Sequence, residues 1–346
     1  MSLPSQVRLG SSGLKISPVI VGCMSYGSKS WSQWVIEDKE KVFEILKHCY
    51  DNGLRTFDTA DMYSNGLSER LLGEFLKRYN IRRETVVILT KIFFAVDDSL
   101  ELSYLEQTHD TSPEISLDLS NQRGLSRKHI LDGVSKSVER LGTYVDVLQI
   151  HRLDKETPME EIMRSLNDVV ESGQVRYLGA SSMLATELAE LQFIAEKHGW
   201  FKFISSQSFY NLLYREDERE LIPFAKKHGV GLIPWSPNAR GLLTRPFGSD
   251  SARKDSDMAY RLLSSITSSE SDKCIINRVE EIAKKRGVSM ATVSIAWVLS
   301  KGCYPIVGLN SCERVDEAVK AIHFEFDESE IAYLEEPYGP KPQIFV

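Results

Sequence analysis

Eight short apolar runs, most of them separated by helical patterns, constrain the fold of this 346-residue chain more than any other feature. The runs are PVIVG (18–22), RTFDT (55–59), VVILTK (86–91), YVDVLQIH (144–151), VRYLGAS (175–181), FISSQ (203–207), GLIPW (231–235) and YPIVGL (304–309). Continuous apolar strands indicate a sheet buried on both faces, and alternation with helices indicates parallel strands joined by crossovers. We therefore predict eight parallel strands.

The helical patterns carry start and stop signals. One helix is expected to begin with Ser126 at its N-cap and to end at Gly142, because a Ser hydroxyl caps free N–H groups and glycine adopts the left-handed conformation that ends helices. Another is expected to carry Pro158 in its first turn and to end at Gly173. Such helices fit the crossovers between parallel strands.

Eight strand–helix units predict an α/β fold, a (β/α)8 TIM barrel, formed by a single domain over residues 1–346 with an N-terminal hairpin at about 5–17. A doubly wound open sheet is the alternative, but GCMSYG (22–27) after the first strand lacks the G-x-G-x-x-G pattern typical of that fold. Long loops are expected at about 95–125 and 236–271, after strand ends where barrels place active sites. We expect the second loop to close over a ligand.

Composition excludes several classes of partner. Lys and Arg number 42 against 49 Asp and Glu, a net charge of -7, so no overall positive field attracts nucleic acid or an anionic membrane. The five cysteines are scattered and form no C-x-x-C pair, which indicates reduced thiols and a cytoplasmic location. No uncharged stretch reaches the roughly 18 residues of a membrane span, so we expect no membrane association.

Polar side chains stand at the ends of three consecutive predicted strands. Asp58 ends the second strand, Lys91 the third and His151 the fourth, while Tyr63 lies in the loop DTADMYSNG (58–66). Each residue taken singly has an ordinary structural explanation. Together they place a carboxylate, an amine, an imidazole and a phenol at one mouth of the barrel.

This set suits protonation of a carbonyl oxygen during reduction. A phenol, with a reference pKa of about 10, is a poor acid unless a cation lies nearby, and Lys91 is the candidate cation. Asp58 is the candidate to keep Lys91 charged, and His151 can donate a hydrogen bond to the carbonyl oxygen.

Other chemistries fit less well. The chain has no H-E-x-x-H, G-x-S-x-G or GxxxxGK[ST] motif, and His151 has no neighbouring His or Cys for a metal, so no metal is expected. A lyase that forms a Schiff base on Lys91 is an alternative. Asp58 argues against it, because a charged amine is no nucleophile.

Long segments of the chain resemble the aldo-keto reductases, specifically their fungal aryl-alcohol dehydrogenase-like branch. The resemblance is carried by GLRTFDTADMYSNGLSERLLGEFL (53–76), LTK (89–91), LGTYVDVLQIHRLD (141–154), VRYLGASS (175–182), SSQSFYNLLYR (205–215), PWSPNARGLL (234–243) and PIVGLNSCERVDEAV (305–319). It implies a barrel that binds NADP(H) without a Rossmann motif and reduces small aldehydes or ketones. It further implies that Tyr63 is the general acid, that Lys91 and Asp58 lower its pKa, and that His151 orients the carbonyl.

The same resemblance implies a cofactor site. Its residues would be Gly22, Cys23, Met24, Asp58, Ser181, Ser182, Gln207, Trp235, Ser236, Pro237, Asn238, Gly241, Gly308, Leu309, Asn310, Arg314 and Glu317. Trp235 would stack on the nicotinamide ring and Arg314 would favour the 2'-phosphate of NADP(H). Arg253 and Lys254 are candidates for further phosphate contacts.

Four aromatic residues, Tyr26, Trp31, Phe93 and Phe94, are expected to line the substrate pocket and to favour an aromatic or medium-chain carbonyl compound. The alternative function is a cofactor-binding regulatory barrel with little turnover, because the chain also resembles potassium-channel β-subunits.

Overall fold

The computed structural model describes residues 3–109, 112–249 and 269–344, and its main sheet has eight parallel strands in the order β10-β3-β4-β5-β6-β7-β8-β9. The strands are β3 (Ile20–Gly22), β4 (Thr56–Asp58), β5 (Val87–Ile92), β6 (Val145–Ile150), β7 (Val175–Ser181), β8 (Phe203–Gln207), β9 (Gly231–Leu232) and β10 (Ile306–Gly308). Seven of the eight apolar runs contain one of these strands, and β5 extends by one residue, Ile92, beyond the run 86–91. The predicted (β/α)8 fold is confirmed.

The two ends of the sheet meet and close it into a barrel. Trp235, just after β9, forms a parallel bridge with Ile306 of β10. Backbone N–H groups of Tyr304 and Ile306 donate to the carbonyl oxygens of Leu232 and Pro234, each at 2.8 Å. The backbone groups at these two sheet edges are thereby satisfied by each other.

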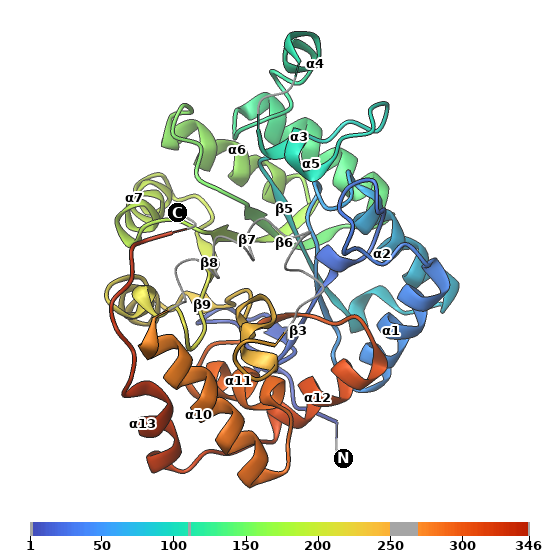
Figure 1. Ribbon diagram of the computed structural model, residues 1–346. Helices are drawn as coiled ribbons and strands as arrows, with labels where there is room; N and C mark the ends of the chain where they lie inside the picture. Colours follow the sequence, from blue (N-terminus) through green and yellow to red (C-terminus); the bar gives the residue numbers. More distant parts are fainter. Residues whose placement is uncertain (1–2, 110–111, 250–268, 345–346) are drawn as a thin grey trace.

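Helices surround the strands on the outside (Figure 1). They are α1 (Lys39–Asp51), α2 (Leu67–Arg78), α3 (Tyr104–Thr108), α4 (Pro113–Asp118), α5 (Arg127–Leu141), α6 (Met159–Glu171), α7 (Ala185–His198), α8 (Leu221–Lys227), α10 (Glu270–Arg286), α11 (Met290–Ser300), α12 (Cys312–Ile322) and α13 (Glu328–Glu335). The segment 95–125, expected as a loop, contains α3 and α4, and α4 protrudes at the top of Figure 1. Residues 250–268, which include Arg253 and Lys254, lie outside the described part of the chain.

Two predicted helix starts have different outcomes. Ser126 caps α5, with its side chain accepting a hydrogen bond from the N–H of His129, and Gly142 ends that helix at φ 66°. The prediction that Pro158 lies in the first turn of α6 is wrong, because Pro158 is the N-cap residue before Met159, with φ -55° and ψ 132°. Gly173, at φ 78°, follows the end of α6 by two residues.

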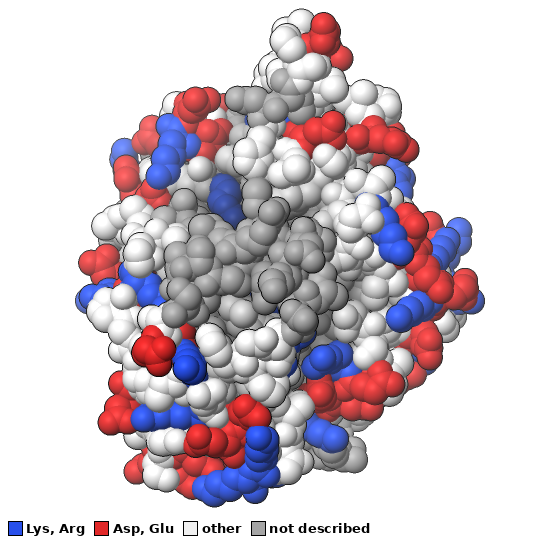
Figure 2. Space-filling model, viewed as in Figure 1, with Lys and Arg blue, Asp and Glu red and all other residues white. Residues whose placement is uncertain are grey.

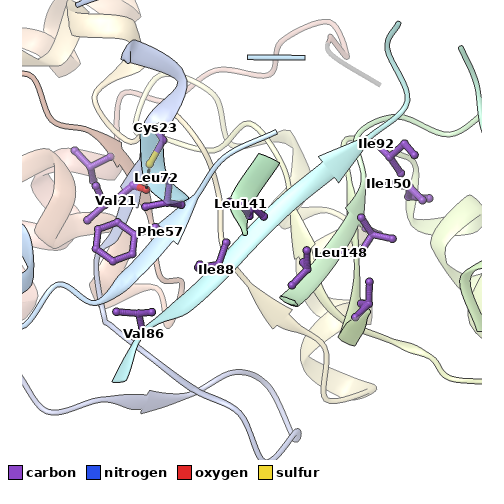
Figure 3. Close-up of a cluster of buried hydrophobic side chains, with 14 of the residues drawn as sticks. Val21, Cys23, Phe57, Leu72, Val86, Ile88, Ile92, Leu141, Leu148 and Ile150 are labelled. Atoms are coloured by element: carbon purple, nitrogen blue, oxygen red, sulfur yellow. Dashed lines mark hydrogen bonds between the residues drawn. The ribbon is translucent and has the colours of Figure 1, made fainter. Parts of the chain in front are cut away.

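Strand residues alternate between the two faces of the barrel wall, because successive side chains in a strand point to opposite sides. Outward-facing side chains, including Val21, Phe57, Ile88 and Leu148, pack against the helices in the largest apolar cluster (Figure 3). Inward-facing side chains fill the barrel itself, namely Ile20, Leu89, Val147, Ile233 and Ile306. Continuous apolar runs were therefore a correct sign of a wall buried on both sides.

A short antiparallel hairpin of β1 (Val7–Arg8) and β2 (Lys15–Ile16) precedes the barrel. Its fully buried Leu9 and Ile16 join the apolar cluster inside the barrel. The N–H of Ser11 donates to the carbonyl oxygen of Gly229 at 2.8 Å, just before β9 begins at Gly231. The hairpin thus covers the end of the barrel at which the strands begin.

The visible surface mixes both signs of charge. Figure 2 shows acidic and basic side chains interspersed around the rim of this face. Many of them form ion pairs along or between helices, such as Lys47 with Asp51 at 2.7 Å. Within the described residues, no helix is both long and apolar enough to cross a membrane.

Helices α2 and α5 approach closely, and two glycines permit the contact. A side chain at Gly66 would meet Arg140 Cδ at 2.7 Å, and one at Gly73 would meet the backbone oxygen of Leu141 at 2.5 Å. The approach lets Arg140 Nε donate to Glu69 Oε2 at 2.6 Å inside the protein. A second oxygen of Glu69 accepts a hydrogen bond from Thr90 of β5.

We predict that Gly73→Ala lowers the free energy of unfolding by about 1–3 kcal/mol, because the new methyl group would clash with backbone that cannot rotate away. In an open helix the same change would stabilise by roughly 0.5–1 kcal/mol. Urea denaturation measures the effect, with the exposed α5 variant Ser135→Ala as the control. Stabilisation by Gly73→Ala would show that the two helices are not held this closely.

Candidate active site

Four polar side chains meet where β4, β5 and β6 end. Asp58 and Lys91 are inward-facing residues of β4 and β5, His151 follows β6, and Tyr63 lies in the loop before α2. Their exposed fractions are 2% for Asp58, 1% for Lys91, 7% for Tyr63 and 8% for His151. The structure therefore brings together all four residues proposed from the sequence.

The Lys91 amine is fully satisfied. Its Nζ donates to Asp58 Oδ2 at 2.6 Å, to the backbone oxygen of Thr59 at 2.9 Å and to Tyr63 Oη at 3.0 Å. An ammonium has three protons, so these three bonds use all of them. Since the Tyr63 oxygen accepts from Lys91, the phenol's own proton is left to point elsewhere.

The second oxygen of Asp58 is held by two amides. Gln149 Nε2 donates to Asp58 Oδ1 at 3.0 Å and Gln207 Nε2 donates to it at 2.9 Å. Gln207 Nε2 also approaches Gln149 Oε1 at 2.8 Å. Gln149 was not predicted, yet it stands two residues before His151 on one strand, and the two-residue period of a strand would have placed it on the same inner face.

Burial and charge oppose each other in the pKa values of this cluster. Burial alone would lower the pKa of Lys91, but the Asp58 carboxylate, Tyr63 and their hydrogen bonds outweigh it, so the pKa of Lys91 is raised and the amine stays charged. For Tyr63, burial raises the pKa above its ordinary value; Lys91 lowers it and Asp58 raises it. Lys91 thus lowers the pKa of Tyr63 as expected, whereas Asp58 raises it, and burial keeps that pKa above its ordinary value.

The imidazole of His151 is uncharged. Burial, followed by the charges of Lys91 and Arg152, lowers the pKa of His151 well below its usual value. Its ring stands edge-on to Tyr63, with 5.9 Å between the ring centres, and edge-on to Phe94 at 5.1 Å. Among the described residues, its buried Nδ1 has no hydrogen-bond partner. A neutral imidazole donates through only one nitrogen.

Asp58, Tyr63 and His151 line a cavity of about 660 Å³, whereas Lys91 is not part of its described lining. Its wall includes most of the residues expected for the cofactor and one expected for the substrate: Gly22, Met24, Asp58, Ser181, Gln207, Trp235, Ser236, Pro237, Asn238, Gly241, Gly308, Asn310, Arg314 and Phe94. It also includes residues that the sequence did not indicate: Ser25, Gln33, Trp34, Met62, Tyr104, Arg152, Arg240, Thr244, Arg245, Ile306 and Val307.

Four residues expected at the cofactor are absent from the described lining of this cavity: Cys23, Ser182, Leu309 and Glu317. Cys23 and Leu309 are buried in the large apolar cluster outside the barrel wall, where burial raises the pKa of the Cys23 thiol. Glu317 accepts a hydrogen bond from Arg314 Nη1 at 2.9 Å. Glu317 thus contacts Arg314, which lines the cavity, but is not part of the described lining itself.

Three of the aromatics expected to line the substrate pocket, Tyr26, Trp31 and Phe93, are likewise missing from the described lining. Tyr26 turns inward and donates to the backbone oxygen of Leu309 at 2.5 Å. Trp31 donates through Nε1 to Gln107 Oε1 at 2.7 Å and packs behind Tyr63, with ring centres 6.3 Å apart. Phe93 packs against the large apolar cluster. These three aromatic residues therefore pack against other parts of the protein and are not part of the described cavity lining.

The cavity wall offers polar groups to a ligand. Asn238 Oδ1 is buried without a hydrogen-bond partner among the described residues, and Gln207 is bonded to Asp58 of the catalytic cluster. Arg314 also lines the cavity and lies in the first turn of α12, where free backbone N–H groups favour an anion. Within the described residues, no group of three or more His, Cys, Asp or Glu side chains could hold a metal ion.

Comparison with known proteins agrees with this geometry. The family model described as the aldo/keto reductase family matches residues 18–338. The chain belongs to the aldo/keto reductase family. Members of this family are oxidoreductases that act on small carbonyl compounds and generally use a nicotinamide cofactor.

Several relatives match over nearly their whole length. A Saccharomyces cerevisiae protein that carries the name of an aryl-alcohol dehydrogenase is 66% identical over 343 residues, 99% of each chain. The versiconal hemiacetal acetate reductase of Aspergillus parasiticus is 56% identical over 336 residues, 96% of this chain and 97% of the relative. A Schizosaccharomyces pombe protein with an aryl-alcohol dehydrogenase name is 55% identical, covering 96% of this chain and 95% of the relative. The chain is thus similar to fungal aldo-keto reductases.

We predict that Lys91→Met raises the pKa of Tyr63 further, because Lys91 supplies both a charge and a hydrogen bond that lower it. Titration of ring-labelled tyrosine by NMR follows the Tyr63 resonance, which is assigned by its loss in Tyr63→Phe. The exposed α2 variant Lys77→Met is the charge-matched control and leaves the resonance unchanged. An unchanged Tyr63 titration in Lys91→Met would contradict the coupling.

Proposed function

We propose that this protein is an NADP(H)-dependent reductase that converts aldehydes or ketones to alcohols, with Tyr63 as the proton donor. The observation that carries the proposal is the hydrogen bond from Lys91 to the Tyr63 oxygen, which leaves the phenol proton for a ligand in the cavity. NADPH supplies the hydride when it is bound. The chain's own residues supply the proton, the orientation of the carbonyl group and a site with limited access to water.

Tyr63 and His151 would hold the carbonyl oxygen between them. The neutral His151 imidazole can donate one hydrogen bond to that oxygen, while Tyr63 donates the second and transfers its proton as negative charge develops. The charged Lys91 stabilises the phenolate that remains, and Asp58 keeps Lys91 charged. Each of the four residues thus has a separate part in moving one proton.

The cofactor would lie along the cavity wall. Ser181 and Gln207 are placed to bind the carboxamide, Trp235 to stack on the nicotinamide, and Asn238 to offer its unpartnered oxygen. Arg314 distinguishes NADP(H) from NAD(H) in this proposal, since its half-exposed guanidinium can form charge-assisted hydrogen bonds with a 2'-phosphate.

The substrate is proposed to be aromatic or medium-chain. Phe94, Trp34, Tyr104 and Met62 line the cavity on the side of Tyr63, and such walls favour apolar rings. The names of the relatives, aryl-alcohol dehydrogenase and versiconal hemiacetal acetate reductase, point in the same direction.

We further propose that the whole chain forms one domain that works in the cytoplasm. The N-terminal hairpin packs into the interior of the barrel, which supports one folding unit. All five cysteines are free thiols, as a reducing compartment would keep them.

We predict that Tyr63→Phe lowers the rate of benzaldehyde reduction by roughly 10²–10⁴, the usual loss for a general acid, while the Kd for NADPH stays the same. Absorbance of the reduced cofactor measures turnover, with NADPH expected to be preferred over NADH. The matched control is Tyr104→Phe, which removes another hydroxyl from the same cavity. A wild-type rate in Tyr63→Phe would refute the acid assignment, and tight NADPH binding without turnover of any carbonyl compound would favour a regulatory barrel.

The raised pKa of Tyr63 and the lowered pKa of His151 predict opposite pH profiles for the two directions of reaction. Reduction needs a protonated phenol and is expected to stay level between about pH 6 and pH 9, since both groups keep the required form there. Alcohol oxidation needs the phenolate and is expected to rise with pH over the same range. Initial rates in a constant-ionic-strength buffer series measure both, and a reduction rate that falls from pH 6 to pH 8 contradicts the prediction.

A further inference from the structure

Arg152 brings a positive charge to the cavity that the carbonyl chemistry does not require. It follows His151 directly after β6, is partly buried and lines the cavity. Its Nη1 donates to the backbone oxygen of His151 at 2.7 Å. Among the described residues, no carboxylate forms an ion pair with it.

Two guanidinium groups that are removed from solvent meet carboxylates, whereas Arg55 and Arg123, which lie outside the cavity lining, bond backbone carbonyl oxygens. Arg83 pairs with Asp146 at 2.6 Å, and Arg140 pairs with Glu69 at 2.6 Å. A charge that is buried without an ion of opposite charge destabilises a folded protein by several kcal/mol. Proteins therefore retain such a charge mainly where a ligand of opposite charge binds to it. Arg152 has a neutral carbonyl group where Arg83 and Arg140 have an anion.

The position of Arg152 separates it from the proposed phosphate site at Arg314. In the ring of strands, β6 lies across the barrel from β10, which leads to α12 and Arg314. Burial and the charge of Arg240 lower the pKa of Arg152, while Tyr104 and Tyr63 raise it. Because Arg152 directly follows His151 and lines the same cavity as Tyr63, its cation lies on the side where the carbonyl substrate would bind.

We propose that Arg152 is a specificity-determining residue that binds a carboxylate on the substrate, so that the preferred substrates are aromatic aldehydes with an acidic group. A planar guanidinium binds a carboxylate through two parallel hydrogen bonds, which also fixes the direction of the ring. The side chains of Trp34, Phe94 and Tyr104 in the cavity wall suit the aromatic ring of such a substrate, which lies between its aldehyde group and its carboxylate. This inference rests on the proposed carbonyl reductase function.

The test compares 4-carboxybenzaldehyde with two uncharged aldehydes, its methyl ester and benzaldehyde, in wild type and in Arg152→Gln. Wild type is expected to prefer the carboxylate over the ester by at least about tenfold in kcat/KM. Arg152→Gln is expected to lose roughly 10–100-fold on the carboxylate, mostly in KM, since a hydrogen bond to a charged group contributes about 1.5–3 kcal/mol. Both uncharged aldehydes should change less than about threefold. Arg152→Lys should recover part of the loss, because it keeps the charge without the two parallel bonds.

Control measurements distinguish carboxylate binding by Arg152 from effects on overall charge, on the acidity of Tyr63 and on cofactor binding. Arg82→Gln makes the same change of charge at a side chain that is 72% exposed and should alter none of the rates. Equal losses on charged and uncharged aldehydes, or a shifted pH profile, would instead assign Arg152 to the acidity of Tyr63 and overturn the proposal. A weakened Kd for NADPH in Arg152→Gln would assign it to the cofactor and would overturn it too.

Binding without turnover distinguishes failure of this inference from failure of the proposed function. Calorimetry with benzoate and benzamide, in the presence of NADP⁺, should show benzoate binding to wild type and at least about tenfold weaker binding to Arg152→Gln. If no aldehyde is reduced while benzoate binds in this way, the reductase proposal fails and the anion site stands. If benzaldehyde is reduced but benzoate and benzamide bind alike, the anion site fails and the reductase stands.

Discussion

The buried ion pair of Lys91 and Asp58 is the interaction on which the rest of the site depends. It joins β4 to β5, and the two amides on Asp58 extend it to β6 and β8. A slip of one residue in any of these strands would turn its side chain from the interior into the wall, because strand residues alternate. The position of the proton donor Tyr63 beside Lys91 therefore depends on the correct register of these strands.

Burial is the largest influence on the pKa values of Tyr63 and His151, and it outweighs the effect of the neighbouring Lys91 charge on Tyr63. A cation beside a phenol lowers its pKa in water, but removal from solvent disfavours the phenolate more strongly than Lys91 favours it. The resting site therefore holds a protonated Tyr63 and a neutral His151, both of which are donors. That state holds the two donors that the proposed carbonyl reduction needs, and Lys91 favours the phenolate that proton transfer leaves behind.

The strands and the four catalytic candidates could be predicted from the residues themselves, because strand periodicity and strand ends have fixed directions in space. Most of the cavity wall was predicted only through the resemblance to the aldo-keto reductases. Loop residues lack such a rule. Trp31 and Tyr26 were misplaced because their polar ends found partners in Gln107 and the Leu309 carbonyl group, which only the folded chain brings near. Gln149 could have been predicted to face the interior, because it stands two residues before His151 on the same strand. For Arg152, the only indication in the sequence was that it directly follows His151.

The loops are in turn fixed by polar contacts and by strained backbone. Among the described residues other than glycine with positive φ, Ser236 and Arg240 line the cavity, and Ser64, Ser182 and Ala239 each stand next to a residue that lines it. Each such residue costs of order 1–3 kcal/mol and persists only where its surroundings impose it. The Asn65 amide donates to the backbone oxygens of Asp97 and Leu100, and the Asn211 amide donates to that of Ser236. Tyr63, which precedes Ser64 directly, therefore owes its position beside Lys91 to loop contacts as much as to the strands of the barrel.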